Sequence, residues 1–199
     1  MDATAIFEKS AMGGDRCLRQ GEILSNVVQV HIEQSSLETR PLLLSEKTHP
    51  YAVILSQWCD LDSDHRARNS SDASENEGSK SRNQIPTVLF CEVHTASELK
   101  TAVPKGSEIW RRIQQNNDER YHFLERVAPE LDAEGLGLEE MGIDFKRFFA
   151  IPTDEVYHRL KVGQARRRCC LASPYLEHFC RRFANHLSRI ALPVPHVSC

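Results

Sequence analysis

Several features that identify common protein classes are absent from this sequence. No apolar run approaches the roughly 18 residues that a membrane-spanning helix needs. The motifs G-x-x-x-x-G-K, G-x-G-x-x-G, H-E-x-x-H and G-x-S-x-G do not occur, which removes the most recognisable nucleotide-binding, metalloprotease and hydrolase signatures. Internal repeats and coiled-coil heptads are also lacking. We therefore expect a globular protein with no membrane partner, whose function no standard motif reveals.

The amino terminus and the cysteines predict a reducing compartment. An acid at Asp2 and the lack of an apolar core of signal-peptide length favour a cytoplasmic protein. Seven cysteines are an odd number, so we expect reduced, mostly buried thiols. Cys91 and His94 have the spacing of a ligand pair, but no second pair accompanies them. The sequence predicts neither a metal site nor a cofactor.

Short apolar runs predict the fold. Strands are expected at 21–32, 51–58, 85–94, 121–123 and 143–149, and helices from Ser107, from Thr153 and from Ser173. The first strands follow one another without helices between them, which favours antiparallel pairing. The predicted class is α+β: a small bent antiparallel sheet or an SH3-like barrel with C-terminal helices, in one domain of residues 1–199. In the closing helix Phe183 falls on the apolar face, whereas Arg182 falls outside it.

A polar stretch separates the second and third predicted strands. Residues 62–84 are dominated by Ser, Asn, Asp, Glu, Lys and Arg, and their only apolar residues are Ala67 and Ala73. A segment of this composition cannot bury a face of its own. We expect a disordered surface loop over 62–84.

Charge is unevenly divided along the chain. Residues 145–199 hold ten Lys and Arg against three Asp and Glu, a net charge of +7, while residues 1–144 carry −10. A basic segment can neutralise phosphates, which makes Arg166, Arg167 and Arg168 candidates for nucleic-acid binding. The alternative is that amphipathic helices carry these arginines on their solvated faces.

Two short strings could support chemistry. Cys59 and Asp60 stand where a predicted strand enters the polar stretch, where a thiol and a carboxylate could form an active pair. A buried cysteine followed by a turn is the alternative. Arg120 and His122 share one side of a predicted strand, where they could hold and protonate a phosphate. A solvated strand face is the alternative there.

Three segments resemble the MazF/PemK toxin family. They are Gln20-Gly21-Glu22-Ile23, the run from His49 to Ser56 and the run from Thr87 to Thr95. That family folds as an SH3-like barrel and cuts single-stranded RNA. The resemblance covers the first half of the chain, places His49 at the family's catalytic arginine (Arg40-Pro41 is a second register) and matches its threonine to Thr95.

A second resemblance concerns two other strings. Residues 56–61 and 182–193 are similar to small uncharacterised bacterial proteins of mobile and defence gene neighbourhoods. This similarity implies a bacterial stress or antiphage role and no particular chemistry.

Three functions remain open from the sequence. The first is a bacterial nucleic-acid-binding protein that acts as an endoribonuclease-like toxin or antiphage component. Its candidate catalytic residues are His49, Asp60, Thr95, Arg120 and His122. The second is a non-catalytic module that binds a protein partner, and the third is a cysteine-dependent enzyme. No oligomeric state is predicted.

Overall fold

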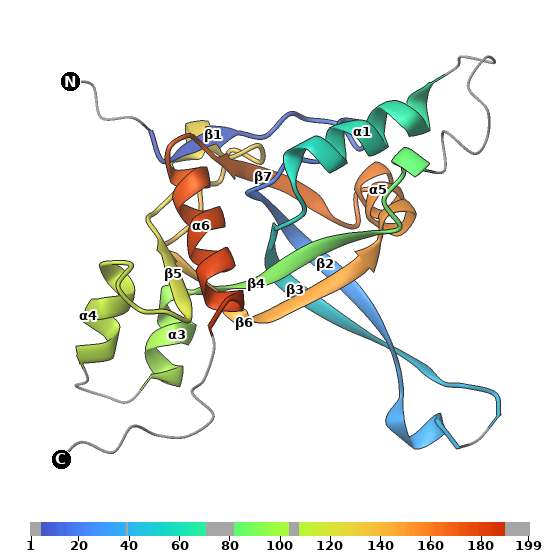
Figure 1. Cartoon of the computed structure of the whole chain (residues 1–199), viewed down its shortest axis with the longest axis horizontal. Helices are drawn as coiled ribbons and strands as arrows, with labels where there is room; N and C mark the ends of the chain where they lie inside the picture. Colours follow the sequence, from blue (N-terminus) through green and yellow to red (C-terminus); the bar gives the residue numbers. More distant parts are fainter. Residues whose placement is uncertain (1–4, 39, 71–81, 104–107, 190–199) are drawn as a thin grey trace.

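Seven strands form one antiparallel sheet in the computed structural model, which describes residues 5–38, 40–70, 82–103 and 108–189 (Figure 1). The strand order is β1-β7-β2-β3-β4-β6-β5. The bounds are β1 (Phe7–Lys9), β2 (Glu22–Ile32), β3 (Leu44–Ile54), β4 (Thr87–Thr95), β5 (Tyr121–Leu124), β6 (Met141–Pro152) and β7 (Arg166–Leu171). The outer strands β1 and β5 do not pair within the described residues, so the sheet is not closed into a barrel. The predicted α+β class with a bent antiparallel sheet is confirmed, and its barrel alternative is not formed.

Helices lie at both ends of the sheet and across it (Figure 1). Their bounds are α1 (Trp58–Asn69), α3 (Ala96–Ala102), α4 (Glu108–Gln114), α5 (Thr153–Lys161) and α6 (Tyr175–Leu187). The helix predicted from Thr153 is confirmed, and Gly163 follows it with a φ of +74°, the left-handed conformation that ends many helices. No helix in the described parts of the chain is long and apolar enough to cross a membrane.

The core consists of three clusters of buried side chains. The first joins the sheet to α6 through Phe145 and Phe179, both fully buried. The second joins Phe90 to residues of α1 and α5, and the third packs α3 and α4 against Tyr121 and Phe123. None of the six described cysteines forms a disulfide, and Cys91, Cys169 and Cys170 are buried.

The prediction of a loop over residues 62–84 is wrong for residues 62–69, which belong to α1. Helix α1 extends to Asn69, and the side chain of Asp64 is fully buried. The Asp64 carboxylate accepts two hydrogen bonds from Nε of Arg68, at 2.8 Å, and one from the backbone N–H of Ile85, at 2.9 Å. Within the part of α1 that falls in this stretch, the buried residues are the paired Asp64 and Ala67, so its composition resembles that of a loop. Residues 71–81 lie outside the described residues.

Strands β2 and β3 bend and continue beyond their neighbours. Asn26 has a φ of 57°, a left-handed conformation that asparagine tolerates. Leu24 and Val27 therefore both reach the second core cluster, although strict alternation would place them on opposite faces. Pairing with β7 ends at Ser25 and pairing with β4 ends at Tyr51, so the rest of the two strands forms a two-stranded arm that projects from the body (Figure 1).

Candidate functional site

A β-bulge in β6 positions a group of charged side chains on one face of the sheet. Cys91 of β4 pairs with Phe148, and Val93 pairs with Ile143, so the four residues 144–147 of β6 stand opposite the single residue Glu92. The side chain of Asp144 holds the bulge by accepting a hydrogen bond from the backbone N–H of Lys146 at 3.1 Å. Bulges of this kind redirect side chains and are frequent beside active sites.

The carboxylate of Glu92 lies at the centre of what we term the Glu92 cluster: Lys47, His49, Glu92, His94 and Arg147. Oε1 accepts a hydrogen bond from Nζ of Lys47 and lies 3.3 Å from Nδ1 of His49. Oε2 lies 3.3 Å from Nε2 of His94 and 3.2 Å from a terminal nitrogen of Arg147. One carboxylate therefore contacts two imidazoles and two permanent cations.

The cluster has a buried floor and an accessible rim. The Glu92 side chain is 8% exposed and that of His49 is 3% exposed. The side chains of Lys47, Arg147 and His94 are 50%, 54% and 26% exposed. A ligand from solvent would thus meet the cations and His94 first, and Glu92 beneath them.

A second buried carboxylate extends the cluster toward β5. Asp144, 3% exposed, accepts hydrogen bonds from Nε of Arg120 at 2.8 Å and from a terminal nitrogen of Arg120 at 2.6 Å. Nε of Arg147 lies 3.5 Å from the same carboxylate. Arg147 therefore connects the Glu92 cluster to Arg120, and the charged network spans β3, β4 and β6 up to the start of β5.

Glu92 and His49 of the cluster have different protonation states. Burial raises the pKa of Glu92, but hydrogen bonds from Lys47 and Arg147 outweigh burial, and the net pKa lies below the ordinary value. Burial, aided by the charge of Lys47, lowers the pKa of His49 to about 4. At neutral pH Glu92 is ionised and His49 is a neutral imidazole, stacked on Phe149 with ring centroids 4.0 Å apart.

The structure brings only two of the five predicted catalytic residues into this network. His49 lies in the cluster and Arg120 is joined to it through Asp144. His122 points into the core, where burial is the main cause that lowers its pKa to about 3. Thr95 caps α3, its hydroxyl accepting from the backbone N–H of Glu98. Asp60 is exposed in the first turn of α1, on a different part of the surface.

The predicted surface of three arginines is not present. A terminal nitrogen of Arg167 lies 2.8 and 2.9 Å from the carboxylate oxygens of Glu22, and both side chains are buried. Arg168 donates two hydrogen bonds to Asp132, at 2.7 and 2.8 Å, again in the interior. Only Arg166 is half exposed, and it pairs with Glu134. Two of the three guanidinium groups are therefore unavailable to a phosphate in this structure.

Ion pairs within the chain explain the uneven charge of the sequence. Six arginines of the basic segment 145–199 pair with carboxylates of residues 1–144. These pairs are Arg147 with Glu92, Arg159 with Glu46, Arg166 with Glu134, Arg167 with Glu22, Arg168 with Asp132 and Arg189 with Glu119. The basic segment is largely neutralised by the acidic one, so its net charge does not by itself indicate a nucleic-acid surface.

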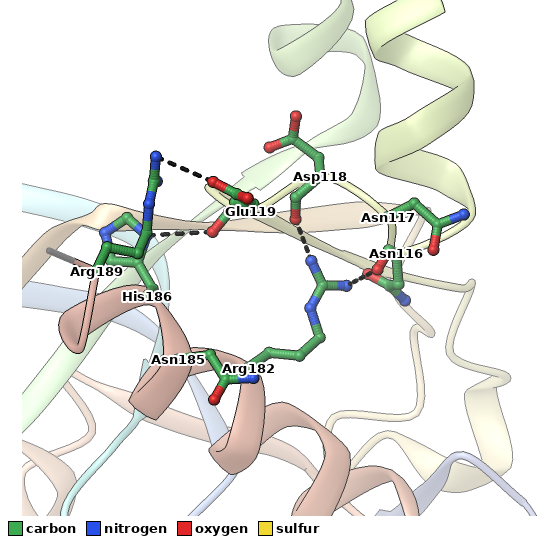
Figure 2. Close-up of a pocket in the computed structure, with 8 residues that line it drawn as sticks. All are labelled: Asn116, Asn117, Asp118, Glu119, Arg182, Asn185, His186 and Arg189. Carbon is green, nitrogen blue, oxygen red and sulfur yellow. Dashed lines mark hydrogen bonds and ion pairs between the residues drawn. The ribbon is translucent and has the colours of Figure 1, made fainter. Parts of the chain in front are cut away.

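A polar pocket of about 280 Å³ lies between α6 and residues 116–119 (Figure 2). Its most inward cation, Arg182, donates hydrogen bonds to the backbone carbonyls of Asn116, Asp118 and Tyr121. Arg189 pairs with Glu119 at its rim. Because these polar groups already bind one another, we interpret the pocket as a clamp between α6 and β5.

An apolar groove of about 760 Å³ lies on the other side of α6, between it and β4. Phe179 is buried at its base, whereas Leu187 is 55% exposed at its edge. Asp60 lines the groove, and the neighbouring Cys59 is exposed, with its Sγ 3.7 Å from Oδ1 of Asp60.

Sequence reasoning missed most of the Glu92 cluster. Asp144 and Arg147 come from a segment that the sequence indicated only as a strand, and Lys47 lies outside every predicted strand. One signal was present: Glu92 and His94 interrupt an otherwise apolar strand on a single face, and a polar residue at a buried position is informative.

Comparisons of the chain with protein-family models, with curated proteins and with solved structures gave no match.

Proposed function

We propose that this protein binds single-stranded RNA at the Glu92 cluster and cleaves it by acid–base catalysis. The observation that carries the proposal is the contact of one nearly buried carboxylate with an accessible histidine and two half-exposed cations. Carboxylate and imidazole are the commonest general bases and acids, and lysine and arginine stabilise charge on a phosphoryl group.

The reaction needs only groups present in the cluster and in RNA. Glu92 accepts the proton of the ribose 2′-hydroxyl, whose oxygen attacks the adjacent phosphorus. The bond from phosphorus to the 5′-oxygen breaks, and His94 in its protonated form donates a proton to that oxygen. The products are a 2′,3′-cyclic phosphate and a 5′-hydroxyl, so protons and electrons balance. Lys47 and Arg147 stabilise the charge on the phosphoryl oxygens.

Substrate binding would also strengthen Glu92 as a base. The pKa of Glu92 is lowered by Lys47 and Arg147 against the effect of burial. A phosphate that draws these cations toward itself removes part of the lowering, while burial continues to raise the pKa. His49 holds Oε1 of Glu92 from below and is a positioning residue in this scheme.

The experiment is a cleavage assay with a short fluorescently labelled single-stranded RNA and a DNA of the same sequence. The proposal expects RNA fragments that end in a 2′,3′-cyclic phosphate, and DNA that is bound but stays intact because it lacks the 2′-hydroxyl. Cleavage of both, or of neither, would contradict it. If the protein cleaves RNA, the corresponding biological role is that of a bacterial toxin or antiphage component. Expression of the protein in bacteria should then arrest their growth.

A second function, a non-catalytic protein-interaction module, is favoured by the apolar groove beside α6. Phe183 and Leu187 leave apolar surface accessible along one helix face, which fits an apolar segment of a partner protein. If RNA is neither bound nor cleaved, and a Leu187→Glu variant loses a protein partner that the wild type retains, this module is the function.

A further inference from the structure

The groove between α6 and β4 is lined mainly by apolar side chains. They come from both of its walls: Leu55, Ile85, Pro86, Leu89, Phe179, Cys180, Phe183, Ala184 and Leu187. Of the described residues that line it, only Asp60 and Arg181 carry a charge, and both are exposed. Burying a charge without a partner is costly, so the groove fits an occupant that is apolar and uncharged.

Helix α6 ends at the edge of this groove. Its last residue, Leu187, is 55% exposed and lines the groove. Ser188 closes the helix, because its backbone N–H donates to the carbonyl of Ala184 at 3.0 Å and its hydroxyl donates to the carbonyl of Asn185 at 3.1 Å. The chain therefore leaves the helix beside the apolar surface, and whatever follows Arg189 starts next to it.

The residues that follow have the composition that the groove requires. Residues 190–199, which lie outside the described residues, read Ile-Ala-Leu-Pro-Val-Pro-His-Val-Ser-Cys and contain no Asp, Glu, Lys or Arg. The prolines Pro193 and Pro195 restrict the backbone to extended conformations, in which a segment needs no strand or helix partner. Such a preorganised segment loses little conformational entropy when it binds, and apolar grooves are a common docking site for it.

The length of this segment is sufficient. Eight residues separate Phe179 from Leu187 along the part of α6 that lines the groove, a distance of about 12 Å at 1.5 Å per residue. An extended proline-containing chain advances about 3.1 Å per residue, so about four residues cover that distance. Residues 191–194 can therefore line the groove after a reversal of direction at 188–190.

We propose that the 190–199 segment folds back along α6 and occupies the groove of its own chain, with Leu192 and Val194 packed against Phe183 and Leu89. The segment is joined directly to the groove, which gives it an effective concentration of about millimolar even if its intrinsic affinity is low. This advantage favours it over a separate protein of similar composition. The proposal does not depend on RNA cleavage, and a partner protein that uses the groove has to displace the segment first.

The test is a search for nuclear Overhauser effects in the purified full chain with labelled methyl groups and aromatic rings. The proposal expects cross-peaks from the methyl groups of Leu192 or Val194 to the ring of Phe183 and to the methyl groups of Leu89. Leu89 belongs to β4, on the opposite wall, so proximity in the sequence cannot produce that contact. The absence of these cross-peaks would overturn the proposal. So would cross-peaks that a mixture of labelled and unlabelled chains shows to be intermolecular, since a second copy would then supply the segment.

A pair of variants tests whether the apolar side chains hold the segment in place. Leu192→Asp brings a charge into the groove and should abolish the contacts of Val194 with Phe183 and Leu89. Ser198→Asp is the matched control, because it lies beyond the four residues that cover the groove, and it should keep them. Contacts of Val194 that survive in Leu192→Asp, or that are lost in Ser198→Asp, would contradict the proposal.

Discussion

The guanidinium of Arg147 lies 3.2 Å from Oε2 of Glu92, although the two residues are 55 positions apart in the chain. The bulge in β6 allows this contact because it places residues 144–147 of β6 opposite the single residue Glu92 of β4. Side-chain direction alternates along a regular strand, so removing or adding a residue there would turn Arg147 away from the cluster.

The first prediction concerns RNA affinity. Arg147→Ala should weaken binding of a short single-stranded RNA and flatten its dependence on salt by about 0.7 in the slope of log K against log [salt], the value for one lost phosphate contact. Binding measured by fluorescence anisotropy over a salt series checks this. Arg166→Ala is the matched control, because Arg166 is equally exposed but lies outside the cluster. Equal slopes for the two variants would assign the phosphate contact elsewhere.

The second prediction concerns acid. Burial is the main cause that lowers the pKa of His49 to about 4 and that of His122 to about 3, from 6.5 in the unfolded chain. Below pH 6.5 the unfolded state binds protons that the folded state excludes, so stability that is fully present above pH 6.5 is lost as the pH falls toward 4. The melting temperature should fall over this range.

A histidine variant isolates one of these groups. His122 has rings of Phe145, His178 and Phe179 within 6.2 Å, so His122→Phe replaces it with an apolar ring. This variant should lose part of the pH dependence of the melting temperature. The prediction is wrong if His122→Phe and the wild type lose stability in parallel.

The third prediction concerns α6. Arg182 donates to three backbone carbonyls, and Arg182→Ala would leave these acceptors without a partner in a partly enclosed pocket (Figure 2). We expect a loss of about 2–4 kcal/mol in the free energy of unfolding. Denaturant titration should show Arg181→Ala, at an exposed neighbour, close to the wild type. A small effect of Arg182→Ala would mean that water replaces its hydrogen bonds.

The fourth prediction concerns α1. Asp64→Ala removes a buried acid and leaves Arg68 without its main partner, which should cost about 3–5 kcal/mol. Asp62→Ala, in the same helix, removes a pair with the 78% exposed Arg66 and should cost less than about 1 kcal/mol. Similar melting temperatures for the two variants would support a loop that contributes nothing to the core.

The sequence predicted the sheet better than the surface. A short apolar run located β4, and apolar positions located β5 and β6, because those strands bury one or both faces. The pattern of apolar residues is the main local signal of a strand. The same signal failed for α1, where the buried positions include Asp64 and Ala67. A paired buried acid is indistinguishable from a solvated one until its partner is known.

The site was less predictable because its residues meet through pairing register. The basic run at 166–168 looked like a surface, yet β7 is an inner strand of the sheet, so Arg167 and Arg168 lie in the interior and pair with Glu22 and Asp132. His49 was found through a family resemblance, and the contact of Arg147 with Glu92 depends on a bulge that no local pattern indicated.

The most direct test of the proposed activity is the cleavage rate of the Glu92→Gln variant on single-stranded RNA. Loss of a general base predicts a fall in kcat of about 10²–10⁴-fold, while Glu139→Gln, at an exposed residue outside the cluster, should cleave at the wild-type rate. If Glu92→Gln cleaves RNA as fast as Glu139→Gln, Glu92 is not the base and the cluster is not the active site.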